Sequence, residues 1–183
     1  MAEKVVYIKF FGEVNQNTIK ALMDTIQQKL KEGANKFVLL ISSVGGNVFA
    51  GITGYNFLKG VPAKIETFNI GSTISVAVAL YCAGSKRYSA PHATFLIHGV
   101  TWGFAQPITL EEKQLEECLK ACIIDKENIA GVIAATTGKK EAQVLEDMHN
   151  RTTLNPEEAI KYGLVHEIKE SLFETGAELI SIQ

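Results

Sequence analysis

The stretch that decides the fold is Phe68–Val100, FNIGSTISVAVALYCAGSKRYSAPHATFLIHGV. A strand pattern leads into a glycine-containing turn, a helix pattern begins near Ser75, and a second strand pattern ends at His98. Two strands joined through a helix form a β-α-β unit, which predicts parallel strands. Ser75 and His98 both fall where an element begins or ends. Each alone is more often structural, but together they are candidates for a nucleophile and its base.

The same alternation of strands and helices continues on both sides of this stretch. Strand patterns at Val5–Phe11 and Phe37–Ser42 alternate with helix patterns, which predicts the α/β class with a largely parallel sheet. Downstream, apolar residues recur at helical spacing from Leu110 to Thr136, over a helix longer than such a domain needs. We predict one domain over residues 1–183, with its core at about 5–108 and 138–170 and a protruding helix at about 110–136.

Composition argues against several classes of protein, namely disordered, nucleic-acid-binding and membrane proteins. The 183 residues are 46% hydrophobic with a formal net charge of -2, which argues against disorder and gives no electrostatic case for nucleic acid or a membrane surface. No apolar stretch is long enough to span a membrane and the N-terminus does not resemble a signal peptide, so we expect a cytoplasmic protein. Cys118 and Cys122 would share a helix face but lack further ligands, so neither metal nor cofactor is predicted.

A pair of glycines, Gly45 and Gly46, follows the strand at Phe37–Ser42. Adjacent glycines permit positive φ and leave a backbone N–H without a side chain over it. The turn is not a phosphate loop, because no Gly-Lys-Ser or Gly-Lys-Thr follows. Most such pairs are only tight turns. With a hydroxyl and an imidazole, however, the N–H groups of Gly46 and Val76 would complete the requirements of acyl transfer.

Three ordered stretches resemble the proteolytic subunit of the Clp protease family, within the Clp/crotonase superfold. They are ISSVGGNVFAGITGYNFL (41–58), GSTISVAVALYCAGSKRYSAPHATFLIHG (71–99), and TGKKEAQVLEDM with LNPEEAIKYGLVHEI (137–148 and 154–168). The resemblance covers nearly the whole chain. It implies a serine endopeptidase with Ser75 as nucleophile, His98 as general base, and the N–H groups of Gly46 and Val76 as the oxyanion hole.

The residue that orients the histidine departs from the family pattern. Counted back from Tyr162, the family's aspartate position holds Arg151, which cannot accept a hydrogen bond from an imidazole. A shift of one residue would let the amide oxygen of Asn150 serve instead. Asp147 is the second choice, and a serine–histidine dyad stays open.

The resemblance also implies partners. The substrate would be a peptide or an unfolded protein, and the helix at about 110–136 resembles the family's handle, through which subunits assemble into a heptameric ring or a tetradecamer. Family members carry axial loops ahead of their first core strand, whereas here that strand begins by Val5. The use of an ATPase unfoldase therefore stays open.

Three other interpretations compete with a serine endopeptidase. A catalytically weak or inactive ring or scaffold protein would keep the fold without its orienting aspartate. A crotonase-type acyl-CoA enzyme needs carboxylates for proton transfer, and residues 42–65 and 69–99 contain none. A serine–lysine peptidase could use Lys59, Lys64 or Lys86, but His98 fits the family's histidine position.

Overall fold

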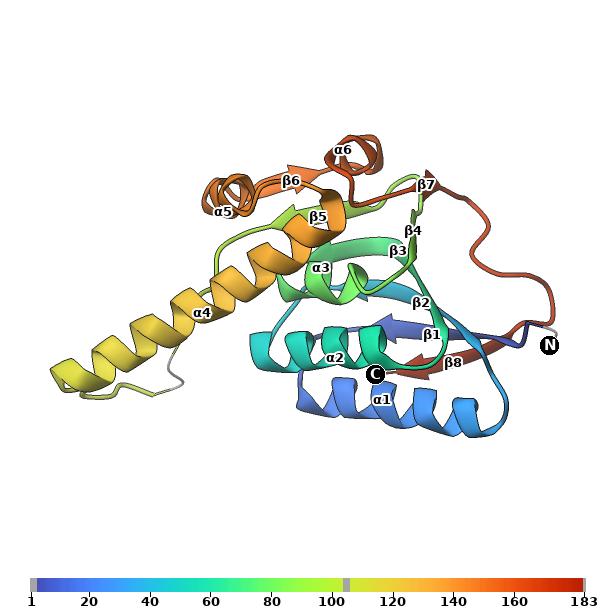
Figure 1. Ribbon diagram of the computed structural model, residues 1–183, viewed down its shortest axis with the longest axis horizontal. Helices are drawn as coiled ribbons and strands as arrows, with labels where there is room; N and C mark the ends of the chain where they lie inside the picture. Colours follow the sequence, from blue (N-terminus) through green and yellow to red (C-terminus); the bar gives the residue numbers. More distant parts are fainter. Residues whose placement is uncertain (1–2, 104–105, 183) are drawn as a thin grey trace.

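The computed structural model describes residues 3–103 and 106–182, in which eight strands form one sheet (Figure 1). The strands are β1 (Val5–Phe11), β2 (Lys36–Ser43), β3 (Lys64–Ile74), β4 (Lys86–Ser89), β5 (Thr94–Ile97), β6 (Thr152–Leu154), β7 (Glu167–Ile168) and β8 (Glu178–Ile182). The main order is β6-β5-β3-β2-β1-β8, with β4 pairing to β3 and β7. Every pairing is parallel except that between β5 and β6. The predicted α/β class with a largely parallel sheet is confirmed.

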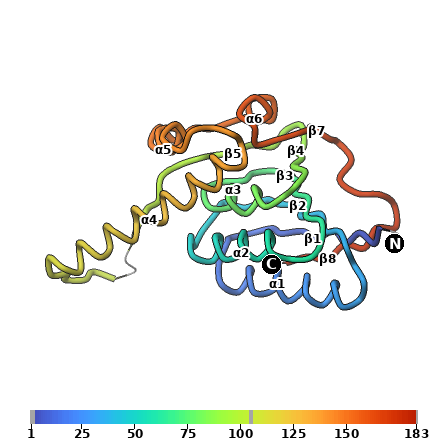
Figure 2. The backbone as a smooth tube through the Cα atoms, viewed as in Figure 1, coloured from blue at the N-terminus to red at the C-terminus, as the bar shows by residue number. Residues whose placement is uncertain are grey.

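Helices follow the strands in the order that the β-α-β pattern predicts. They are α1 (Gln16–Lys31), α2 (Val48–Gly60), α3 (Val76–Tyr81), α4 (Glu112–Thr137), α5 (Glu141–His149) and α6 (Pro156–Tyr162). Figure 2 shows the same path as a tube, with α1 and α2 on one side of the sheet and α5 and α6 far from them.

Alternating residues of the central strands divide the core into two clusters. In β2, Phe37, Leu39 and Ile41 pack with α1, α2 and α3 in the larger cluster, whereas Val38 and Leu40 pack with Phe68 in a smaller one on the opposite face. Both faces of β2 are thus covered, which explains its continuous apolar run.

Strand β3 runs further than the sequence predicted. The turn expected at residues 71–75 is strand up to Ile74, because β3 changes partner there: residues 66–69 pair with β4, and residues 72–74 pair with β5. The side chain of Asn69 fills the gap between the two partners. It donates to the Thr94 carbonyl at 2.8 Å and accepts from the Gly71 N–H at 3.1 Å.

Three strands were not anticipated. The segment at residues 86–91 contains β4, in which the guanidinium of Arg87 is buried and donates to the carbonyl oxygens of Leu164, Gly84 and Gly163. A charged residue therefore lies inside the sheet because backbone acceptors surround it. The short strand β6 lies beside β5, and β8 pairs with β1 at the outer edge of the sheet.

Helix α4 projects away from the sheet in Figure 1. Its buried residues, Ile129, Ala130, Ile133 and Ala134, all lie in its second half. In its first half, Leu115 and Leu119 are 55% and 62% exposed. The predicted helix at about 110–136 is thus present, and its projecting half carries apolar side chains that this chain does not cover.

Candidate active site

Ser75 lies at the junction of β3 and α3 in a backbone conformation that side chains rarely adopt. Its φ is +59° and its ψ is -132°. Among the described residues, only Arg151 shares a positive φ without being glycine. Such conformations cost roughly 1–3 kcal/mol and are concentrated at functional sites. Ser75 occupies the N-cap position of α3, yet its hydroxyl makes no cap hydrogen bond. The half-buried hydroxyl is therefore free for another use.

The turn at Gly45 and Gly46 lies directly against Ser75. A methyl group added at Gly45 would lie 2.7 Å from the Ser75 Cβ and 3.4 Å from its Oγ, so a side chain there would collide with the serine. Gly46 forms an isolated parallel bridge with Val14. In this bridge Val14 donates to the Gly45 carbonyl and accepts from the Asn47 N–H. The bridge therefore does not use the N–H of Gly46 as a hydrogen-bond donor.

The second donor comes from the first turn of α3. Val76 is the first residue of this helix, and the first N–H groups of a helix have no acceptor within it. Two backbone N–H groups, of Gly46 and Val76, thus belong to the two segments that flank the Ser75 hydroxyl.

His98 follows β5 and leaves the sheet at the same edge as Ser75. Ile74 pairs with Leu96, and the Ser75 N–H donates to the Leu96 carbonyl at 2.9 Å, so both residues lie at the carboxyl ends of neighbouring parallel strands. Between the residues described, no hydrogen bond joins Ser75 to the imidazole. Catalytic hydrogen bonds are often long before substrate binds.

The tautomer of His98 follows from its one recorded hydrogen bond. Its Nδ1 lies 2.7 Å from the carbonyl oxygen of Gly99. A carbonyl oxygen only accepts, so Nδ1 carries the proton and the Nε2 of the neutral ring keeps its lone pair. A general base that acts through Nε2 requires this tautomer.

Helix α5 ends beside the residue that follows His98, because the Gly99 N–H donates to the Met148 carbonyl at 3.1 Å. The two candidates for orienting the histidine are engaged elsewhere. The amide nitrogen of Asn150 donates to Glu146 at 2.9 Å, and Asp147 accepts from the Tyr162 hydroxyl at 2.6 Å. Burial and this carboxylate raise the pKa of Tyr162 well above its ordinary value. Neither candidate has a recorded bond to His98 in the described chain.

Arg151 lies just beyond the end of the ladder that β5 and β6 form. This antiparallel ladder pairs Leu96 with Thr153 and ends where Ile97 pairs with Thr152, so His98 and Arg151 are the next residues on the two chains. Arg151 has a φ of +54° and is exposed. The structure thus brings Ser75, Gly46, Val76 and His98 to one edge of the sheet, and Arg151 follows the strand that pairs with β5.

Two contributors to this site were not predicted. The sequence predicted Gly45 only as part of a turn, whereas in the structure it closely approaches Ser75. The sequence did not predict the carbonyl of Gly99, because a backbone acceptor leaves no signal in a side-chain pattern. For Gly45, the Gly-Gly dipeptide was the only signal in the sequence.

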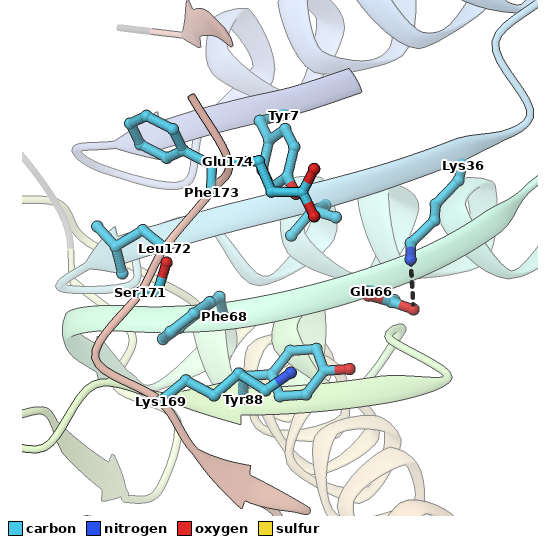
Figure 3. A pocket seen from close by; sticks show the side chains of 11 residues that line it. Tyr7, Lys36, Glu66, Phe68, Tyr88, Lys169, Ser171, Leu172, Phe173 and Glu174 are labelled. Carbon is cyan, nitrogen blue, oxygen red and sulfur yellow. Dashed lines mark ion pairs between the residues drawn. The ribbon is translucent and has the colours of Figure 1, made fainter. Parts of the chain in front are cut away.

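A separate cavity of about 300 Å³ lies on the sheet face opposite α1 and α2 (Figure 3). The segment 169–174 crosses strands β4, β3 and β2 there, and its Leu172 packs on the smaller core cluster. Lys36 pairs with Glu66 at 3.1 Å within this cavity. It shares no lining residue with the site around Ser75.

In residues 3–103 and 106–182, no three His, Cys, Asp or Glu side chains gather closely enough to hold a metal ion. None of the helices in these ranges is both long enough and apolar enough to cross a membrane.

The chain is similar to known proteins over most of its length. Residues 2–171 match the family model described as Clp protease. The ATP-dependent Clp protease proteolytic subunit 2 of Chlamydia trachomatis is 27% identical over 175 residues, which are 92% of this chain and 84% of that protein. The protein of the same description from Chlamydia pneumoniae is 28% identical over 145 residues. Among solved structures, an asparagine-to-aspartate mutant of ClpP1 from Listeria monocytogenes matches with a TM-score of 0.79, at 27% identity and 92% coverage of each chain.

Proposed function

The chain belongs to the Clp protease family, and on that basis we propose that it is a serine endopeptidase with Ser75 as its nucleophile. The observation that carries this proposal is the conformation of Ser75. The residue is held at a φ of +59° at a strand–helix junction, with its hydroxyl left out of the helix cap. A structural cap would have used that hydroxyl and would not need the strain.

In the proposed mechanism, Ser75 Oγ attacks the peptide carbonyl carbon while Nε2 of His98 takes its proton. The N–H groups of Gly46 and Val76 donate to the oxyanion, at the positive end of α3. His98 then gives the proton to the leaving amine, and an acyl-enzyme remains on Ser75. Water, deprotonated by His98, releases the acid and regenerates the serine.

For the residue that orients the imidazole of His98, we propose Asn150. Its recorded hydrogen bond uses only the amide nitrogen, so within the described chain the amide oxygen has no donor. Asp147 already accepts from Tyr162. Rotation of the Asn150 side chain would offer its oxygen to the Nδ1 proton in place of the Gly99 carbonyl. We expect Asn150→Ala to lower kcat about tenfold at unchanged KM. An unchanged kcat would leave a dyad held by Gly99.

The nucleophile is tested with a labelled fluorophosphonate, which reacts with activated serines. We expect the wild-type protein to take up the label on Ser75, as located by mass spectrometry, and Ser75→Ala to take up none. Ser72→Ala is the matched control, because Ser72 is another half-buried serine three residues earlier, in β3. Label that persists in Ser75→Ala would contradict the assignment. A wild-type protein that takes up no label would instead fit a non-catalytic ring protein.

We also propose that the chain assembles into a homo-oligomeric ring through α4. The support is the exposed apolar row at Leu115, Leu119 and Ile123, which are four residues apart and lie on one face of the projecting half. A ring would enclose the serines in a chamber that unfolded proteins and peptides enter.

A further inference from the structure

A cleft of about 390 Å³ lies between the start of α2 and α4 and contains one of the proposed oxyanion donors. Gly46, Val48 and Phe49 form one wall, and Val100 and Trp102 form another. Asp125 comes from the middle of α4, and Asn47, Thr101 and Gly103 also line the cleft. The cleft therefore combines apolar and polar walls with one carboxylate.

Asp125 is the one ionisable residue among the described residues that line this cleft. In the described chain it forms neither an ion pair nor a hydrogen bond, although seven other acidic residues pair with lysines. It is half-buried, and burial raises the pKa of its carboxyl group above the ordinary value. A partly buried carboxylate without a partner is unfavourable unless a cation or donor reaches it.

The proposed mechanism fixes which part of a substrate enters the cleft. The oxyanion on the Gly46 N–H belongs to the residue just before the scissile bond, so the side chain of that residue branches from the Cα next to the reacting carbonyl carbon. A lysine or arginine has a long apolar stem and a charged tip. The stem would lie along Val48 and Val100, and the tip would reach the carboxylate.

We propose that Asp125 selects substrates with lysine or arginine directly before the scissile bond. This inference rests on the proposed function, because it uses the oxyanion position to orient the peptide. A basic side chain supplies the partner that Asp125 lacks, whereas a neutral one leaves the carboxylate without one. An acidic side chain is repelled.

The test uses pairs of fluorogenic peptides that differ only in arginine or citrulline before the scissile bond. Citrulline has nearly the same shape without the charge. We expect a kcat/KM ratio of about tenfold or more in favour of arginine, as for hydrogen bonds between charged groups. In Asp125→Asn the ratio should fall to within about twofold. Glu127→Gln removes the same charge two residues along α4 and should keep the wild-type ratio.

A binding measurement separates this inference from the proposed function. Fluorescence anisotropy with the Ser75→Ala protein compares peptides that end in arginine or citrulline, and no turnover is required. Tighter binding of the arginine peptide that Asp125→Asn removes would support the inference. Equal affinities would overturn it, even where fluorophosphonate labels Ser75 and peptides are cleaved. Absence of labelling and cleavage would instead count against the proposed function.

Discussion

Replacing Arg151 by aspartate is expected to raise peptidase activity, because it places a carboxylate opposite the imidazole of His98. The ladder of β5 and β6 ends where Ile97 pairs with Thr152, and continuing that register would place position 151 across from His98. The backbone there has a φ of +54°. Aspartate and asparagine adopt this conformation more readily than most residues, so the substitution does not conflict with the local fold.

The size of the effect follows from Coulomb's law. Residues opposite each other in an antiparallel pair have Cβ atoms about 4.5–5.5 Å apart. A unit charge at about 5 Å from the imidazolium contributes about 3 kcal/mol at an effective dielectric constant near 20 and about 0.8 kcal/mol in water. His98 is half-buried and position 151 is exposed, so a value of about 1–2 kcal/mol applies. This is a gain of about 5- to 30-fold in kcat.

The assay compares Arg151→Asp with Arg151→Asn by hydrolysis of one fluorogenic peptide. The two variants have the same shape, and both suit the backbone, so their ratio reports the charge alone. The ratio should shrink between about 0.1 and 1 M salt, because salt screens exposed charges. Equal activities of the two variants, with each labelled fully at Ser75, would refute the placement of position 151 beside the imidazole.

Three further predictions concern the site, the stability and the assembly. Gly45→Ala should abolish fluorophosphonate labelling, whereas Gly33→Ala should not: both glycines have a φ of +88°, but only at Gly45 would the new methyl group meet Ser75, at 2.7 Å. The pKa of His166 is lowered from 6.5 by burial and then by the charges of nearby cations. The unfolded chain therefore takes up the proton more readily, and the free energy of unfolding should fall as pH drops below about 6.5; denaturant titrations should show less of this slope in His166→Gln. Leu119→Glu should reduce the particle mass measured by light scattering, whereas Lys120→Gln, with the same change of charge, should not; equal masses would argue against assembly through α4.

The sequence predicts best where local chemistry and fold agree. The helix at 156–162 has its start signals in the local sequence: Asn155 is the cap, Pro156 is in first position, and Asn155 accepts from the Glu158 N–H at 2.9 Å. The continuous apolar run of β2 predicts a strand that is buried on both faces, as strands of a covered parallel sheet are. These features depend on neighbours a few residues away.

Other features depend on contacts between distant parts of the chain, and local sequence patterns do not predict them. Strand β4 is held by Arg87, whose partners include backbone carbonyls near residue 164, so no local pattern in the sequence indicates this strand. At the site, the sequence alone indicated Ser75 and His98 as candidates for a nucleophile and its base. Three contributions are visible only in the folded structure. They are the approach of Gly45 to Ser75, the carbonyl of Gly99 at the imidazole, and the carboxylate of Asp125 in the cleft.

The outermost strand of the sheet has a consequence for synthesis of the chain on the ribosome. Val6–Phe10 pairs with Glu178–Ile182 in parallel register, across almost the full sequence. Until that late segment emerges, β1 has an unpaired edge, and such an edge can pair with another chain. Contacts of this separation also form slowly. Nascent chains in one polysome would thus expose the same open edge to one another, and a molecular chaperone would be most useful in that interval.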